Sequence, residues 1–287
     1  MKKLFKSMIC VLPNALIWCG VIQNSAFLKA EPPKPVTSQQ STPPATQPTS
    51  DKKNQSRPVF RWAKTPGNLS TIPGRHTGMA SRDVCPDVEL PLRALIPFKQ
   101  RDLTNQLSKE SSSASPLDVW GLTTNEHPTF WYYVPYTKDI AGASAEFVLQ
   151  ESEDEEKTVY QSSIPLPVKP GIVKVTLPTT TMPLQIGKNY RWFFKVSCSG
   201  KQSVPIYVEG DIQRVNLNTN LAKQIASAKP REQVSIYADN GIWFDAVNLL
   251  VQLRQANPND VALVSDWDSL LESVQIEKNY LKAPLVD

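Results

Sequence analysis

The sequence predicts a mixed β and α protein, mainly β, in which an antiparallel β-sandwich precedes a small helical domain. Two observations carry this prediction. About seven short runs rich in β-branched and aromatic residues recur between residues 90 and 214, with proline and glycine between them. After Asn218 the apolar residues recur every three to four positions instead, which is the period of an amphipathic helix.

The run YRWFFKVSC, residues 190–198, shows how a strand of the sandwich faces its core. Tyr190, Trp192 and Phe194 alternate with Arg191 and Lys195. Because successive side chains of a strand point to opposite sides, the aromatic set is predicted to be buried. The lead-in LQIGKNYRW also places Tyr190 where immunoglobulin-like and fibronectin-like sandwiches put their corner tyrosine.

Two polar stretches interrupt the strand-like runs. The first, KQRDLTNQLSKESSSASPLDVWG at residues 99–121, is long enough to be a surface loop of its own. The second, ESEDEEK at residues 151–157, gathers acidic side chains but lacks the glycine and the interleaved ligands of a calcium loop. We therefore predict a solvated hairpin tip there.

Four helices are predicted after the last strand. The first is capped at Asn218 or Thr219, and the second opens at Pro230 and ends at Asn240–Gly241. The third spans about residues 242–255, and the fourth, VALVSDWDSLLESV, follows the NPND break.

The segment YADNGIWFDAVNLLVQLRQANPND resembles one tetratricopeptide-like helical hairpin. Gly241, Ala246 and Pro258 stand where that pattern places its small residues and its terminating proline. Such hairpins normally stack in at least three units, and only one is present in the sequence. An ordinary helix pair is therefore the alternative interpretation.

Residues 1–30 have the three-part layout of a secretory signal peptide, with a lysine-rich start, an apolar stretch and a small, polar end. The apolar stretch is about fifteen residues, shorter than the roughly twenty of a spanning helix. We expect cleavage at Ala26 or Ala30, with retention as an anchor as the alternative. The mature protein is thus predicted to be exported to the periplasm or beyond, with no transmembrane span.

The rest of the chain divides by composition. Residues 31–84 are predicted to be a tether rich in Pro, Ser and Thr with an irregular lead-in, since the tether has too little apolar surface to fold. The sandwich is expected at 85–215 and the helical domain at 216–287. The formal charge of +4 arises within the signal, so the mature part is neutral and has no electrostatic footprint for nucleic acid.

Cysteine usage points to one disulfide bond. Cys10 and Cys19 lie in the predicted signal, which leaves Cys85 and Cys198 in the exported part. An even pair in an oxidising compartment is predicted to be bonded. Two separate buried thiols are the alternative.

Few residues are suited to catalysis or to metal binding. The two histidines, His76 and His127, have no second ligand at metal spacing, so no metal or other cofactor is expected. Glu126 and His127 are weak catalytic candidates, and a loop histidine bonded to a carbonyl is the simpler interpretation. No motif of a nucleophile elbow, zinc protease or phosphate-binding loop occurs.

The run TFWYYVP suggests a candidate binding surface. If Phe130 points into the sandwich, then Trp131 and Tyr133 point out, and Phe193 is expected to join them from a neighbouring strand. A soluble monomer rarely leaves such an apolar patch bare. The helical domain is the expected cover, a ligand or partner platform is the first alternative, and an inverted face assignment is the second.

The strings GLTTNEHPTFWYYVPY, EFVLQ, PGIVKVTLP, GKNYRWFFKVSC and GIWFDAVNLLVQLR, in this order, resemble a family of exported bacterial proteins catalogued as domain of unknown function 928. The resemblance covers about residues 72–274 and implies no activity or functional residue. We interpret the chain as a non-enzymatic binding or scaffolding module whose partner is another envelope protein. The alternatives are an envelope hydrolase using Glu126 and His127, and a structural accessory of a secretion or assembly system.

Overall fold

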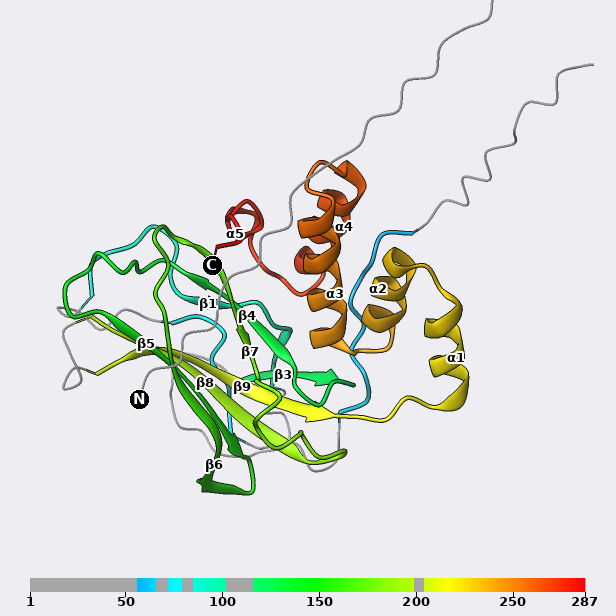
Figure 1. Cartoon of the computed structure of the whole chain (residues 1–287), viewed down its shortest axis with the longest axis horizontal. Coiled ribbons are helices and arrows are strands. Elements are labelled where there is room, and N and C mark those ends of the chain that lie inside the picture. Colours follow the sequence, from blue (N-terminus) through cyan, green and yellow to red (C-terminus); the bar gives the residue numbers. More distant parts are fainter. Residues whose placement is uncertain (1–55, 66–71, 79–84, 102–115, 199–203, 287) are drawn as a thin grey trace, which may run out of the picture. The chain divides into compact units, whose positions relative to one another are not determined.

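The computed structural model describes residues 56–65, 72–78, 85–101, 116–198 and 204–286. The predicted signal peptide and most of the predicted tether lie outside these residues. The described part is a mixed β and α structure in which two β-sheets are followed by five helices (Figure 1). Residues Lys52–Asp287 form one compact unit.

The smaller sheet has three antiparallel strands in the order β1–β4–β7. These are β1 (Arg93–Ala94), β4 (Thr129–Val134) and β7 (Gly171–Thr176). Close to the C-terminus, Leu285 forms a parallel bridge with Ile172 of β7. The end of the chain therefore returns to the outer strand of this sheet.

The larger sheet has six strands in the order β2–β3–β9–β8–β5–β6. Its members are β2 (Phe98–Gln100), β3 (Leu117–Thr123), β5 (Ser144–Glu151), β6 (Asp154–Ile164), β8 (Asn189–Ser197) and β9 (Ile206–Arg214). The expectation of a purely antiparallel arrangement is wrong at one pair, because β3 and β9 run parallel. A parallel pair requires a long crossover, and the intervening strands of both sheets provide it.

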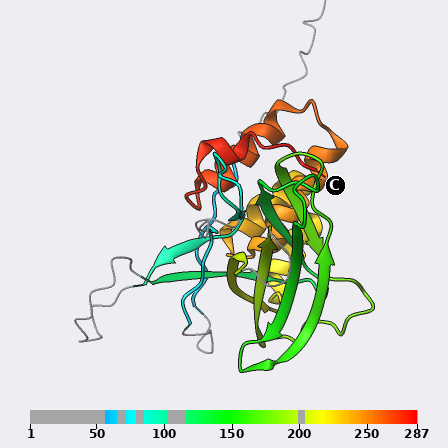
Figure 2. The ribbon, with the colours of Figure 1, turned by 90° about the vertical axis from the view of Figure 1, so that its left-hand side faces the viewer.

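The loop predicted at residues 99–121 is also corrected, because strands occupy both of its ends. β2 pairs with β3, and in Figure 2 the two extend together away from the other strands. Val119 and Trp120 of β3 are 2% and 1% exposed. A strand that is covered on both faces shows no polar–apolar alternation, so its short sequence was not distinguishable from a loop.

The two sheets pack through aromatic side chains. Tyr132 of β4 stacks on Phe194 of β8 with ring centres 4.4 Å apart, and Phe130 lies 4.9 Å from Phe147 of β5. The predicted inward face of residues 190–198 is thereby confirmed. Tyr190, from the same face, accepts a hydrogen bond on its hydroxyl from the Gln185 backbone N–H at 2.9 Å.

The helices are α1 (Thr219–Ser227), α2 (Pro230–Asp239), α3 (Trp243–Ala256), α4 (Val261–Glu272) and α5 (Lys278–Leu281). The predicted start signals are confirmed: the Asn218 side chain caps α1, and Pro230 opens α2. The four-residue α5 was not predicted, because one turn is too short to show a period. Among the described residues, no helix has both the length and the apolar character needed to cross a membrane.

Helix α3 joins the helices to the sheets in one continuous hydrophobic core. Trp243 at its start donates its indole N–H to the Leu95 carbonyl at 2.9 Å. The next residue, Phe244, packs edge-on against Phe130 of β4 at 5.1 Å. Burying two large rings at this contact fixes the start of α3 against the sheets.

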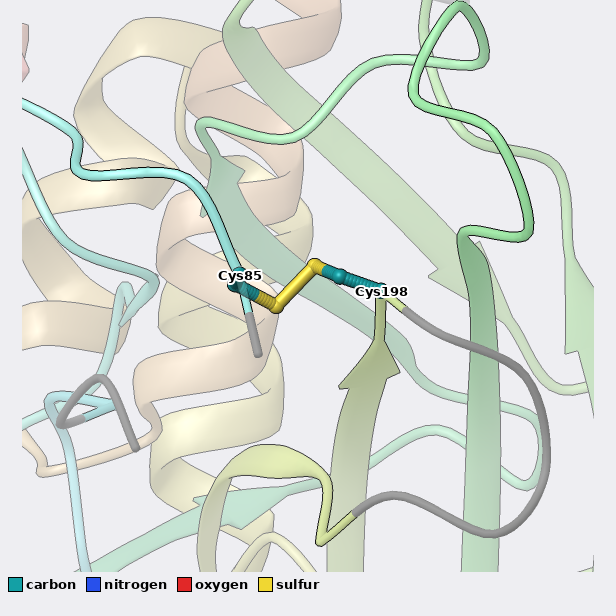
Figure 3. The surroundings of a disulfide bond; sticks show 2 residues. All are labelled: Cys85 and Cys198. Carbon is teal, nitrogen blue, oxygen red and sulfur yellow. A yellow bond between two sulfur atoms is a disulfide. The ribbon is translucent and has the colours of Figure 1, made fainter. Parts of the chain in front are cut away.

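The disulfide bond between Cys85 and Cys198 is present, as predicted (Figure 3). Their Cα atoms are 5.1 Å apart, and 113 positions separate them in sequence. The bond ties the segment before β1 to the end of β8. In the chain-entropy model a crosslink over such a loop stabilises the fold by about 4–5 kcal/mol.

Candidate functional site

The weak catalytic candidates Glu126 and His127 have separate partners in the structure. The Glu126 carboxylate pairs with Arg214 at 3.0 Å, and the His127 Nε2 atom lies 3.0 Å from the Thr181 carbonyl. The histidine contact matches the simpler interpretation of a loop residue bonded to a carbonyl. Glu126 and His127 therefore contribute to holding neighbouring loops.

The aromatic residues of the candidate binding surface lie on two different sheets. Trp131 and Tyr133 of β4 are only 5% and 7% exposed. The ring of Tyr133 packs edge-on against Tyr280 of α5 at 5.2 Å, so part of the helical region covers this strand. The burial of Trp131 and Tyr133 leaves no open aromatic platform at these two positions.

Phe193 does not join them, because β8 belongs to the larger sheet and its outer face points away from β4. The half-buried ring of Phe193 lies between two cations of its own strand, Arg191 at 5.7 Å and Lys195 at 5.3 Å. The expected three-residue surface is thus not formed. The reason is that alternation assigns a face within each strand and does not show which strands share a sheet.

The sequence strings GLTTNEH and GIWFDAV meet at a buried carboxylate. Asp245 in the first turn of α3 is 5% exposed. Its oxygens accept hydrogen bonds from the Thr123 hydroxyl at 2.8 Å, from the Thr124 backbone N–H at 3.1 Å and from the Thr124 hydroxyl. A fourth donor, the Asn125 amide, lies at 3.3 Å. Burial raises the pKa of Asp245, and these hydrogen bonds oppose the rise.

A second buried acidic group lies on the outer face of the larger sheet. The Arg191 guanidinium donates to Glu209 at 2.8 Å and lies 3.4 Å from the Asp211 carboxylate. It also donates to the backbone carbonyl of Pro73 at 2.8 Å. Burial raises the pKa of Asp211 to about 7, and the charge of Arg191 only partly opposes this rise. This cluster fastens residues 72–78 to the sheet.

A pocket with a volume of about 620 Å³ lies between the end of α3, helix α4 and the C-terminal segment. Its lining is mostly apolar, with a few polar and charged side chains. The lining residues are Arg254, Gln255, Pro258, Val264, Asp268, Leu281, Lys282, Ala283, Pro284 and Leu285.

Arg254 is the unusual member of this lining. Its guanidinium carbon lies 4.6 Å from the centre of the Trp267 ring, in a cation–π contact. Its Nη1 atom is buried and has no hydrogen-bond partner in the described part of the chain. Burial lowers the pKa of Arg254, and the charge of Asp268 partly offsets this effect. The residue as a whole is half-buried, and its positive charge lies at the wall of the pocket.

Sequence reasoning missed Arg254, although a signal was present. On α3 it lies four residues after Leu250 and seven after Val247, both fully buried, so it occupies a core-facing position of the helix. A cation at such a position is unusual and requires a partner. The pocket itself could not be predicted, because it also needs residues 281–285 to return beside α4.

A model of the family described as Domain of Unknown Function (DUF928) matches residues 77–285. The chain belongs to this family. The match confirms the resemblance noted in the sequence, and it includes every residue that lines the pocket of this DUF928 chain. No curated protein matches the chain. Within the described ranges of the DUF928 chain, no group of three or more His, Cys, Asp or Glu side chains is placed to hold a metal ion.

Proposed function

We propose that this chain is an exported, non-enzymatic binding module of the bacterial envelope, and that the pocket beside Arg254 is its ligand site. The observation that carries the proposal is the half-buried Arg254 side chain, which lines this pocket together with a second cation, Lys282. A cation at the wall of a pocket can bind an anionic group by charge-assisted hydrogen bonds. Export is supported by the predicted signal peptide together with the Cys85–Cys198 bond.

The ligand is an anionic group with an apolar flank. Arg254 and Lys282 contribute two positive charges to the pocket, and Asp268 contributes one negative charge. The fork of a guanidinium matches the two oxygens of a carboxylate or phosphate. Val264 and Leu285, also in the lining, provide apolar walls for the rest of the molecule.

The chemistry of the lining favours binding over hydrolysis. Among the ten described lining residues there is no Ser, Thr, Cys, His or Tyr, and the groups that could transfer a proton are Asp268 and Lys282. Glu126 and His127 are not part of this lining. A site that holds its ligand without changing it is consistent with an envelope module that hands the ligand, or presents it, to another envelope protein.

Calorimetric titration with two carboxylates tests the proposal. We expect octanoate to bind the exported chain at least tenfold more tightly than acetate, because only octanoate fills the apolar walls. Arg254→Met should reduce octanoate affinity by at least tenfold, which is the loss of one charge-assisted contact. Inorganic phosphate is the third probe, and it reports on anion binding alone.

The matched control is Lys174→Met, which removes one exposed cation from β7. This variant should bind octanoate like the unmodified chain. Equal loss of affinity in both variants would mean that octanoate binding depends only on the net charge of the protein. No octanoate binding to the unmodified chain, or binding that Arg254→Met leaves unchanged, would refute the assignment of the pocket.

A further inference from the structure

The first described residues of the chain occupy a second surface of the helical region. We call residues 56–65 the strap; in Figure 1 it is the blue segment that runs along α2 and α3. Phe60 of the strap is 7% exposed, and its ring packs edge-on against Trp243 at 5.3 Å. Trp62 lies 5.2 Å from the ring of Trp120 on β3. Two aromatic side chains thus anchor the strap.

The strap contacts this surface at every second residue. Pro58 and Phe60 are buried, whereas Val59 between them is 48% exposed and the Arg61 side chain is 74% exposed. This alternation is the pattern of an extended peptide laid on a surface. Trp62 is 37% exposed, and it contacts the surface through its ring, which lies against Trp120.

Main-chain contacts complete the arrangement. The Phe60 N–H donates to the Ser273 hydroxyl at 2.9 Å, and the Arg61 N–H donates to the Ala238 carbonyl at 3.0 Å. Ala63 fits only because residue 241 is glycine, since a Cβ there would lie 2.6 Å from the Ala63 Cβ. We call the receiving residues, Trp120, Ala238, Gly241, Trp243 and Ser273, the strap site.

The family match separates the strap from the strap site. All five residues of the strap site lie within the matched residues 77–285, whereas the strap lies before them. The receiving surface therefore belongs to the family's fold, and its occupant comes from outside the matched region. Backbone hydrogen bonds for affinity and side-chain contacts at alternate positions for specificity are the general means of recognising extended peptides.

We propose that the strap site is a peptide-recognition site for an extended partner segment with aromatic residues two positions apart, and that the strap occupies it as a competing internal ligand. The partner segment would place its first aromatic ring against Trp243 and its second against Trp120. Its backbone would bond to Ser273 and Ala238, as the strap does now. This site is separate from the pocket beside Arg254, and neither proposal depends on the other.

The test uses a fluorescein-labelled peptide with the sequence of residues 56–65 and measures its anisotropy with the exported chain. An internal ligand on a short connection acts at an effective concentration of about 1 mM. If the free peptide binds with a Kd of about 100 μM, this competition weakens its apparent affinity by roughly tenfold. We therefore expect Phe60→Ala/Trp62→Ala, which releases the strap, to bind the peptide at least about tenfold more tightly than the unmodified chain.

The matched control replaces two exposed strap residues outside these contacts, Val59→Ala/Lys64→Ala, and should bind the peptide like the unmodified chain. A labelled peptide with alanine in place of both aromatic residues should bind none of the three proteins. Equal affinity for all three proteins, or no binding to the released variant, would overturn the proposal. So would light scattering that shows the unmodified chain as a strap-exchanged dimer, because the occupant would then be a second copy.

Hydrogen exchange on the unmodified chain keeps the proposal testable if the released variant does not fold. Excess unlabelled peptide should displace the strap and speed exchange of the Phe60 and Arg61 amides, whose hydrogen bonds to Ser273 and Ala238 would open. Unchanged exchange of these two amides at millimolar peptide would contradict an exchangeable strap.

Discussion

Each end of helix α3 carries a charged side chain on the side that faces the core. The two side chains differ in how many hydrogen-bond partners the fold gives them. Asp245 in the first turn accepts hydrogen bonds from Thr123 at the end of β3 and from the next two residues, Thr124 and Asn125. Arg254 in the last turn has a buried Nη1 with no acceptor among the described residues. The helix dipole favours both charges equally, so the difference lies in their partners. A carboxylate with several donors stabilises the fold, whereas a buried donor without an acceptor costs stability.

Removing the carboxylate of Asp245 should cause the largest change in the free energy of unfolding. We expect Asp245→Ala to lower the free energy of unfolding by about 3–5 kcal/mol, because it leaves buried donors of Thr123 and Thr124 unpaired. Urea unfolding measures the change. The exposed Asp139→Ala is the control and should change stability by less than about 0.5 kcal/mol. A loss below about 1 kcal/mol for Asp245→Ala would remove the contrast with Arg254.

The buried carboxylate of Asp211 extends the comparison to pH. Its folded pKa of about 7 lies above the ordinary value of 3.8, so the native state binds this proton more tightly than the unfolded chain does. The free energy of unfolding should therefore fall as the pH rises from about 4 to about 7, by up to about 4 kcal/mol. Urea titrations across this range should show a flatter profile for Asp211→Asn. An identical slope in both proteins would place the titration elsewhere.

A graded version of the first test removes one donor instead of the acceptor. Thr124→Val keeps the shape of the side chain and the backbone contact to Asp245, but it deletes the hydroxyl donor. We expect a loss of about 1–2 kcal/mol in the free energy of unfolding, since one charge-assisted hydrogen bond disappears. Thr129→Val, whose hydroxyl bonds only to the neutral Thr176 hydroxyl, provides the comparison and should cost less.

The sequence predicted local features well because local chemistry determines them. Asn218 as a cap, Pro230 as a helix start and the alternation of Tyr190, Trp192 and Phe194 all depend on neighbours within a few positions. The disulfide between Cys85 and Cys198 was also predictable, because the other two cysteines, Cys10 and Cys19, lie in the predicted signal.

Features that depend on distant contacts were not predictable in the same way. β3 is covered on both faces and lacks a strand pattern, and its parallel pairing with β9 is set by the path of the chain between them. Phe193 was assigned to the wrong surface because it belongs to the other sheet. The pocket combines α3, α4 and residues 281–285, and only Arg254 at a core-facing helical position gave a local sign of it.

The most direct test of the contrast between the two ends of α3 is the stability of Arg254→Met without any ligand. Methionine keeps the packing of the side-chain stem and removes the charge. Loss of the cation–π contact with Trp267 should lower the free energy of unfolding by about 0.5–1 kcal/mol. Removal of the unpaired buried donor should raise it by about 1–3 kcal/mol. We therefore predict that urea unfolding will show Arg254→Met to be as stable as the unmodified chain or more stable. A loss of more than about 1 kcal/mol would show that Arg254 serves the fold, and would contradict its assignment to a ligand.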